Sequence, residues 1–220
     1  MTRGPTVVRP RVIDVRAGFA RCQIVVADAV TIVDPGNAVA VLNALAREAI
    51  TLSAVARIVI THGDGDHWQG AADLAARTGA EIAAHEADAS YIEGRALPRF
   101  SIPKRLLIAA SGRRARRPEV HRRLRGGEKL DGLEVIHTPG HTPGHVSLRI
   151  GDTLIAGDAF STGERFHEVP RLMTSDLRAS RASIRALAAL EIDRAFSGHG
   201  PPADGARAKL RALADALPAR

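Results

Sequence analysis

The 220-residue sequence has a single cysteine, few aromatic residues and no long apolar run. The lone Cys22 excludes an internal disulfide framework. No apolar run approaches the ~20 residues that cross a bilayer, and the first residues lack the apolar centre and cleavage site of a secretory signal. These absences predict a cytoplasmic protein that does not enter a membrane.

Aromatic residues make up only 3% of the chain, which leaves few rings on which nucleic-acid bases can stack. The net charge of +7 is nevertheless compatible with a polyanionic partner, because basic surfaces attract nucleic acids. Most of the cations are arginine in a chain rich in alanine and glycine, as GC-rich coding would produce. A small-molecule substrate is therefore expected ahead of a nucleic acid.

The remaining composition is that of an ordinary globular protein, with 45% hydrophobic and 25% charged residues. A chain of this length can bury roughly 70% of its unfolded surface and form a sizeable core. We expect one domain over residues 1–220. The sequence is also compatible with a homo-oligomer.

Strand and helix patterns alternate along the chain. Runs rich in Val and Ile predict strands, and apolar residues at helical spacing predict helices. Asn37 is placed to cap the first helix, and Gly79 to end the second. The predicted strands cover 6–15, 23–30, 31–34, 56–60, 81–85, 133–137, 146–150, 153–157 and 193–197, and the predicted helices cover 37–50, 68–78, 175–190 and 205–217.

Residues 98–127 differ from the rest of the chain. This segment has two early prolines, many arginines and weak periodicity. It predicts a basic insert, helical or looped, over the body of the domain. A solvated surface excursion accounts for it as well as a binding role does.

Polar clusters follow four of the predicted strands. The stretch THGDGDH after the strand at 56–60 holds His62, Asp64, Asp66 and His67, and later strands lead to His141, Asp158 and His199. Imidazole and carboxylate together suit zinc, manganese or iron. Seven such groups exceed what one ion with an open position needs, so two ions sharing a carboxylate are expected. Two bridged ions activate water, which predicts hydrolysis.

These motifs resemble the metallo-β-lactamase superfamily, whose signature T-H-x-H-x-D-H is followed by single His, Asp and His ligands. The resemblance covers about residues 6 to 205, and the stretches TPGHTPGHVSL and SGHGPP look most like its glyoxalase II-like branch. It implies an α/β fold, an αββα sandwich in which two mixed β-sheets pack between helices. The order and spacing match at Thr61, His62, Asp66, His67, His141, Asp158 and His199.

The resemblance also implies roles for these residues. His62 and His141 would bind the first metal, and Asp66, His67 and His199 the second, with Asp158 between the two. A metal-bound hydroxide would attack the substrate. Asp66 would also steer the proton of the nucleophile, which makes it the catalytic candidate.

Asp64 departs from the family pattern, because it stands where the second histidine of the signature is expected. Its carboxylate can still bind a first-row metal but adds a negative charge, and oxygen donors favour manganese or iron. Zinc remains the expected metal at both positions, with the first ion more exchangeable. An aspartate here also resembles variants found in lactamase-like domains of DNA-uptake proteins.

Four further residues are candidates for supporting the metals or contacting substrate. His145 can orient a ligand or a backbone group, or simply pack. His85 ends a strand that opens toward the site, and Trp68 can line the pocket or pack in the core. Arg165, in the loop after Asp158, can bind an anionic substrate group.

The predicted function is hydrolysis of a small-molecule thioester, ester or lactone. The chain ends about twenty residues after SGHG, which predicts that the C-terminal helical domain of glyoxalase II is missing. A phosphodiesterase or nuclease that uses the arginines of 113–125 is an alternative, and a mononuclear-iron sulfur dioxygenase is another. The sequence does not identify the substrate.

Overall fold

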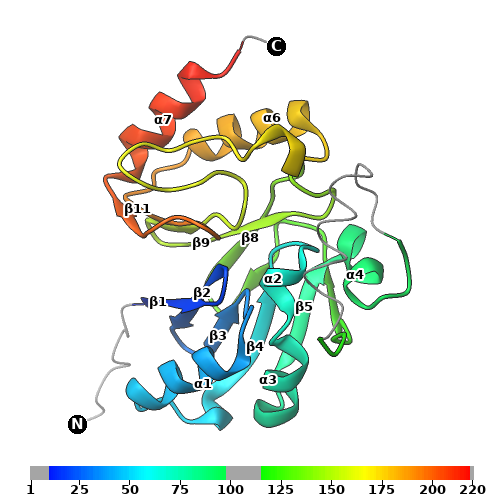
Figure 1. The fold of residues 1–220 in the computed structure, drawn as a ribbon. Helices are drawn as coiled ribbons and strands as arrows, with labels where there is room; N and C mark the ends of the chain where they lie inside the picture. The colour runs from blue at the N-terminus through cyan, green and yellow to red at the C-terminus, as the bar shows by residue number, and fades with distance from the viewer. Residues whose placement is uncertain (1–9, 98–114, 219–220) are drawn as a thin grey trace, which may run out of the picture.

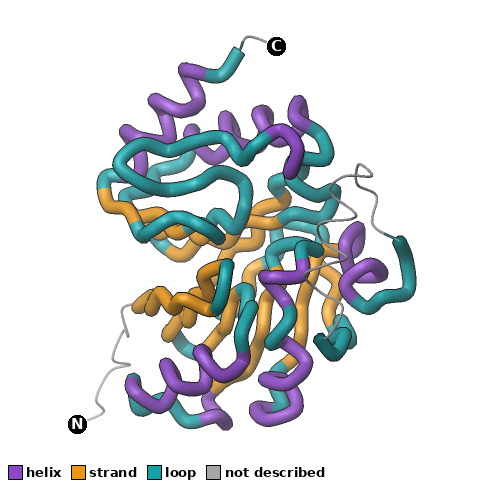
Figure 2. The backbone as a smooth tube through the Cα atoms, viewed as in Figure 1, coloured by secondary structure: helices purple, strands orange, loops and turns teal. Residues whose placement is uncertain are grey.

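The computed structural model describes residues 10–97 and 115–218. Two six-stranded sheets lie face to face, and helices cover the outer face of each (Figure 1). The tube through the Cα atoms shows the same layers, with purple helices at the top and bottom and orange strands between them (Figure 2).

The first sheet has the order β1-β2-β3-β4-β5-β6. Its first three strands are antiparallel neighbours, and β3 to β6 run parallel. The carboxyl ends of β3, β4 and β5 therefore meet at one edge. The strands are β1 Arg11–Ala17, β2 Ala20–Val26, β3 Val30–Val33, β4 Val55–Ile60, β5 Glu81–His85 and β6 Arg122–Leu124.

The second sheet has the order β12-β11-β10-β9-β8-β7. Its strands are antiparallel except for the parallel pair β10 and β11, which brings the carboxyl ends of those two strands together. The strands are β7 Lys129–Leu130, β8 Leu133–His137, β9 Val146–Ile150, β10 Thr153–Ile155, β11 Arg194–Phe196 and β12 Ala203–Asp204.

Helices α1 and α3 cover the first sheet, and α6 and α7 cover the second (Figure 1). Among the helices of the described ranges, none is both long and apolar enough to reach across a membrane. The helices are α1 Ala38–Arg47, α2 Gly65–Trp68, α3 Ala71–Thr78, α4 Glu86–Ile92, α6 Leu177–Ala188 and α7 Ala206–Ala216.

Three apolar clusters hold the layers together. One packs α1 and α3 against the first sheet through residues such as Leu45 and Leu74. The middle cluster joins the two sheets, with Val59 on one side and Leu148 on the other. The third packs α6 and α7 on the second sheet. The expected αββα sandwich is confirmed.

The helix expected over 68–78 is interrupted. It is divided into α2 and α3 at Gly70, whose amide donates to the carbonyl of Pro35 at 2.7 Å. A Cβ at Gly70 would lie 2.5 Å from that oxygen, so only glycine permits this approach. The break turns α2 toward the edge where the strands end. Asn37 and Gly79 cap their helices as expected.

The segment 98–127 was expected to be a helix or a loop, but its last part contains a strand. Arg122–Leu124 form β6, which pairs with β5 at the edge of the first sheet. Residues 98–114 lie outside the described residues, as does the start of the strand expected over 6–15. Helix α4 was not predicted, because its seven residues are too few for a periodic pattern.

Candidate metal centre

The predicted polar clusters meet where the two sheets present their strand ends. His62 follows β4, and Asp66 and His67 lie on the short helix α2 that comes next. From the second sheet, His141 lies between β8 and β9, Asp158 follows β10, and His199 follows β11. The amide of Val146 donates to the carbonyl of Thr61 at 2.9 Å, which joins the loops of the two sheets.

Asp158 lies at the centre of the cluster. Its Oδ2 atom is within 3.2 to 3.8 Å of the Nε2 atoms of His62, His67, His141 and His199. A carboxylate reached by four imidazoles is suited to lie between two cations. The side chain of Asp158 is 7% exposed, so bulk water does not compensate this concentration of charge.

The other side chains divide into two groups of three. In the first, the Nε2 atom of His141 lies 3.0 Å from Oδ2 of Asp64, and that of His62 lies 3.8 Å from it. In the second, the Nε2 atoms of His67 and His199 are 3.3 Å apart, and Asp66 Oδ2 is 3.5 Å from His199. We call these groups the first triad (His62, Asp64, His141) and the second triad (Asp66, His67, His199).

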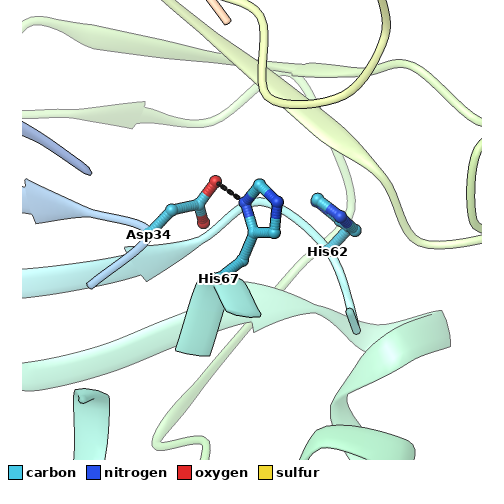
Figure 3. A group of neighbouring side chains, drawn as sticks. All are labelled: Asp34, His62 and His67. Atoms are coloured by element: carbon cyan, nitrogen blue, oxygen red, sulfur yellow. Dashed lines mark hydrogen bonds and ion pairs between the residues drawn. The ribbon is translucent and has the colours of Figure 1, made fainter. Parts of the chain in front are cut away.

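Asp34 orients the imidazole of His67 directly (Figure 3) and that of His62 through Thr61. Its Oδ2 accepts from Nδ1 of His67 at 2.9 Å and from the hydroxyl of Thr61 at 2.6 Å. Since Thr61 uses its hydrogen on Asp34, its oxygen accepts from Nδ1 of His62, 2.9 Å away. Both imidazoles then present the Nε2 lone pair to the cluster, as metal ligation requires.

The carboxylates of the cluster favour a positive charge among them, which a proton supplies on a histidine and a metal cation could supply between the ligands. Burial opposes protonation of His67, but the carboxylates of Asp158 and Asp34 raise its pKa to about 10. Burial likewise opposes ionisation of Asp158, yet the charge of His67 and the hydrogen bond from His199 hold its pKa well below the usual range. Burial, with the charges of His67 and His141, lowers the pKa of His62 well below its usual value.

The residues present fit a pair of cations. Nε2 of His62 is fully buried and has no hydrogen-bond partner among the described residues, although it points at Asp158 and Asp64. Gly198 leaves the space that the donors need, because a Cβ there would lie 2.1 Å from Oδ1 of Asp158. The donors are imidazole and carboxylate groups, which suit first-row divalent metals.

Asp64 faces the cluster despite its position at a helix start. It occupies the N-cap position of α2, yet its side chain makes no capping hydrogen bond. The carboxylate turns instead to Nε2 of His141. It lies where a family histidine would, and it is 4% exposed.

His145 supports the loop that carries Asp158. Its Nε2 atom accepts the backbone N–H of Asp158 at 2.9 Å, so its Nδ1 carries the hydrogen that faces the hydroxyl of Thr138 at 2.8 Å. His145 is therefore a packed, fully buried histidine that also orients a backbone group, the N–H of Asp158.

The three remaining candidates take no direct part in the cluster. Trp68 is 1% exposed and packs in the core, where its Nε1–H donates to the carbonyl of Gly63 at 2.9 Å, so it does not line an open pocket. His85 caps α4 and stacks on His137 with ring centroids 4.1 Å apart. Arg165 is exposed and lines a groove beside α7.

Sequence reasoning missed two buried carboxylates. Asp34 belongs to the segment Asp34-Pro35-Gly36, which reads as a turn, and its φ of 53° shows that it does form one. Asp88 lies on α4 and accepts hydrogen bonds from the loops that carry both parts of the first triad. Their only sequence signal is an aspartate close after a buried strand, which many surface loops share.

Three described arginines of the basic segment have partners within the protein. Arg117 lies over the Trp68 ring at 4.6 Å and donates to the carbonyl of Tyr91 at 3.0 Å. Arg123 pairs with Glu93, and Arg125 with Glu86. These contacts fix α4 and β6.

The chain is similar in sequence to glyoxalase II enzymes. It is 34% identical over 165 residues to a hydroxyacylglutathione hydrolase of Acidiphilium cryptum, covering 72% of this chain and 54% of that protein. A hydroxyacylglutathione hydrolase of Cereibacter sphaeroides is 34% identical over 174 residues, covering 76% of this chain and 56% of the relative. The chain thus spans about half the length of the curated relatives it matches.

Solved structures share the fold. A protein crystallised in a di-iron-bound form superimposes with a TM-score of 0.70 at 24% identity, covering 91% of this chain and 96% of the other. A B3 metallo-beta-lactamase superimposes with a TM-score of 0.71 at 23% identity, covering 90% and 95%. A sequence model of the metallo-beta-lactamase superfamily matches residues 21–199, from the second strand to the last histidine of the cluster. The chain therefore belongs to the metallo-beta-lactamase superfamily.

Proposed function

We propose that the protein is a hydrolase that cleaves a small-molecule thioester, ester or lactone at a centre of two divalent metal ions. The observation that carries the proposal is the position of Asp158 Oδ2, within 3.8 Å of four imidazole nitrogens that belong to two triads. A single ion with an open position would not need so many donors.

The first triad would hold one ion and the second triad the other, with Asp158 shared between them. Zinc is the expected metal, and manganese or iron are the alternatives that the three carboxylates favour. Ions held in this way lower the pKa of a coordinated water and polarise a substrate oxygen. Asp34 would keep the lone pair of His67 aimed at the ions through the hydrogen bond in Figure 3, and Thr61 would do the same for His62.

Asp66 is suited to handle the proton of the attacking water. Its side chain is 23% exposed, against 6% for Asp64 and 7% for Asp158, so it is the carboxylate of the cluster that solvent reaches. In hydrolysis the water oxygen bonds to the acyl carbon, the bond to sulfur or oxygen breaks, and the leaving group takes up a proton. Asp66 would accept the water proton and return it to the leaving group.

The open side of the cluster favours a substrate with an apolar part. Phe19, at the turn between β1 and β2, is 86% exposed, and its ring centroid lies 5.1 Å from that of His199. Two relatives are named hydroxyacylglutathione hydrolases, which supports a thioester as the first substrate class to test.

The decisive experiment measures metals first and activity second. Protein purified without added metal is analysed for metal identity and stoichiometry, and is then assayed with thioesters, lactones and β-lactams. We expect two ions per chain and activity on at least one acyl substrate. Asp158→Asn should lose activity, whereas the exposed Asp28→Asn should not.

Two results would contradict the proposal. Inactivity on the whole panel with two ions bound would exclude this substrate class, and retention of oligonucleotides that weakens steeply with salt would then favour the nuclease alternative. A single iron per chain with oxygen consumption would indicate the sulfur dioxygenase alternative.

A further inference from the structure

Asp88 is a buried carboxylate outside the two triads. It lies on α4, is 3% exposed, and accepts three hydrogen bonds. Its Oδ2 atom accepts from the amide of Gly63 at 2.9 Å and from the hydroxyl of Thr142 at 2.6 Å, and Oδ1 accepts from the amide of Gly144 at 2.8 Å. A buried carboxylate is costly unless donors of this kind satisfy it.

The three donors come from both loops of the first triad. Gly63 lies between His62 and Asp64, and Thr142 directly follows His141. The side chain of Asp88 thus bonds to both loops at once, one from each sheet. None of these three hydrogen bonds of Asp88 is with a member of the second triad.

Both loops lie too close to α4 to move toward it. A Cβ at Gly144 would lie 2.7 Å from the Cγ atom of Asp88, and one at Gly63 would lie 2.7 Å from Cδ1 of Tyr91. Helix α4 is itself held at both ends, by the capping contact of His85 and by Arg117, which donates to the carbonyls of Tyr91 and Ile92. Asp88 is therefore a fixed reference point for the two loops.

We propose that Asp88 is a positioning residue that sets the metal affinity of the first triad and leaves that of the second triad unchanged. It does so by fixing the distance of His62 and Asp64 from His141, without contacting the ion. This inference rests on the proposed function in one respect, that each triad binds a divalent ion.

Asp88→Asn is the sharpest variant, because it keeps the shape of the side chain. The single amide oxygen can accept from Gly63 or from Gly144 but not from both, so in either orientation one backbone donor of the two loops loses its acceptor. Loss of a partner that orients metal ligands typically weakens metal binding about 10- to 100-fold. We expect a loss of that size in one of the two binding steps, and no change in the other.

Calorimetric titration of the metal-free protein with Zn²⁺ measures both steps without any substrate. Asp64→Asn, which alters a member of the first triad, identifies the step that belongs to that triad. Asp73→Asn, an exposed aspartate on α3, is the matched control and should change neither step. Thr142→Val removes one donor to Asp88 and should weaken the same step to a smaller extent, and it serves as the test if Asp88→Asn does not fold.

The outcomes separate the inference from the function it rests on. If the wild-type protein does not bind two ions, the proposed function fails. If it binds two and Asp88→Asn binds both as tightly, or loses both to the same extent, the role of Asp88 is refuted while the proposed function stands.

Discussion

At the scale of single residues, Asp64 is the departure from the metal-binding signature of the family, where it stands in place of the second histidine. Two divalent ions with three carboxylates and a hydroxide carry no net charge, whereas a histidine at this position would leave one positive charge. A neutral centre is a weaker Lewis acid and leaves a coordinated water more basic. In the proposed two-ion centre, Asp64 would thus determine the net charge.

Replacing Asp64 by histidine should restore the usual charge. We expect Asp64→His to bind the first ion more tightly and to shift the pH of half-maximal activity downward, because the more positive centre lowers the pKa of a coordinated water. Metal titration and a pH–rate profile measure both effects. Unchanged values for both would mean that Asp64 is not a ligand.

Asp34 should matter through the imidazole that it orients. Asp34→Asn removes the negative charge beside His67 and replaces an acceptor of three hydrogen bonds by an amide whose one oxygen cannot accept all three, so His67 is held less firmly. We expect about 10- to 100-fold weaker metal binding, measured by calorimetry. Asp28→Asn, at an exposed position in the turn between β2 and β3, should bind normally. Equal affinities in the two variants would argue against this role.

The seven residues of the cluster were predictable, because each follows a strand with a strong apolar pattern and the family signature fixes their spacing. Asp34 and Asp88 were not. A turn aspartate such as Asp34 looks the same in sequence whether its carboxylate faces solvent or a histidine. Only the fold brings it to His67.

At the scale of elements, the loop before β9 packs tightly on α6. Gly140 has a φ of 139°, and a Cβ there would lie 2.2 Å from the backbone nitrogen of Ser180. At Gly151, which has a φ of 59°, an added Cβ would have no atom within 4 Å. Gly140→Ala should therefore cost about 3 kcal/mol in unfolding free energy, and Gly151→Ala about 1 kcal/mol. Urea unfolding of the pair tests this, and equal losses would show that the packing can yield.

His85, at the junction of β5 and α4, should make the protein less stable in acid. Burial, together with the nearby His137, lowers the pKa of His85, so the unfolded chain takes up a proton there more readily than the native protein does. The protein is therefore more stable above the pKa that His85 has in the unfolded chain, and it loses this stability as the pH falls below that value.

His85→Asn keeps a side-chain acceptor for the α4 cap and removes the titrating group. The loss of unfolding free energy between pH 7.5 and pH 5 should be smaller in His85→Asn than in the wild type. Urea unfolding at the two pH values measures it. The same loss in both proteins would exclude His85 as its source.

The elements that sequence patterns did not reveal are the short ones. Helix α4 has seven residues and β6 has three, so neither shows a period. The division between α2 and α3 depends on the carbonyl of Pro35, which is distant in sequence from Gly70. The long amphipathic helices and the apolar strands were predicted because their patterns are local.

At the scale of the whole molecule, bound ions should hold the two sheets together, since each triad draws on both. At a free metal concentration 100 times the dissociation constant, binding adds about 2.7 kcal/mol to stability. Chelation should then lower the melting temperature by about 5 to 10 °C in a chain of this size. Scanning calorimetry with and without chelator measures the shift, and Asp158→Asn should show little of it. An unchanged wild-type melting temperature would contradict a shared centre.

The division of the cluster between the two sheets also determines when it can form. His62 and Asp66 are synthesised directly after β4, whereas His199 is synthesised only after β11. Contacts between segments so far apart form late in folding, because closing the intervening loop costs entropy. A nascent chain therefore cannot complete the centre until β11 has left the ribosome, so uptake of both ions would report that the two sheets have come together.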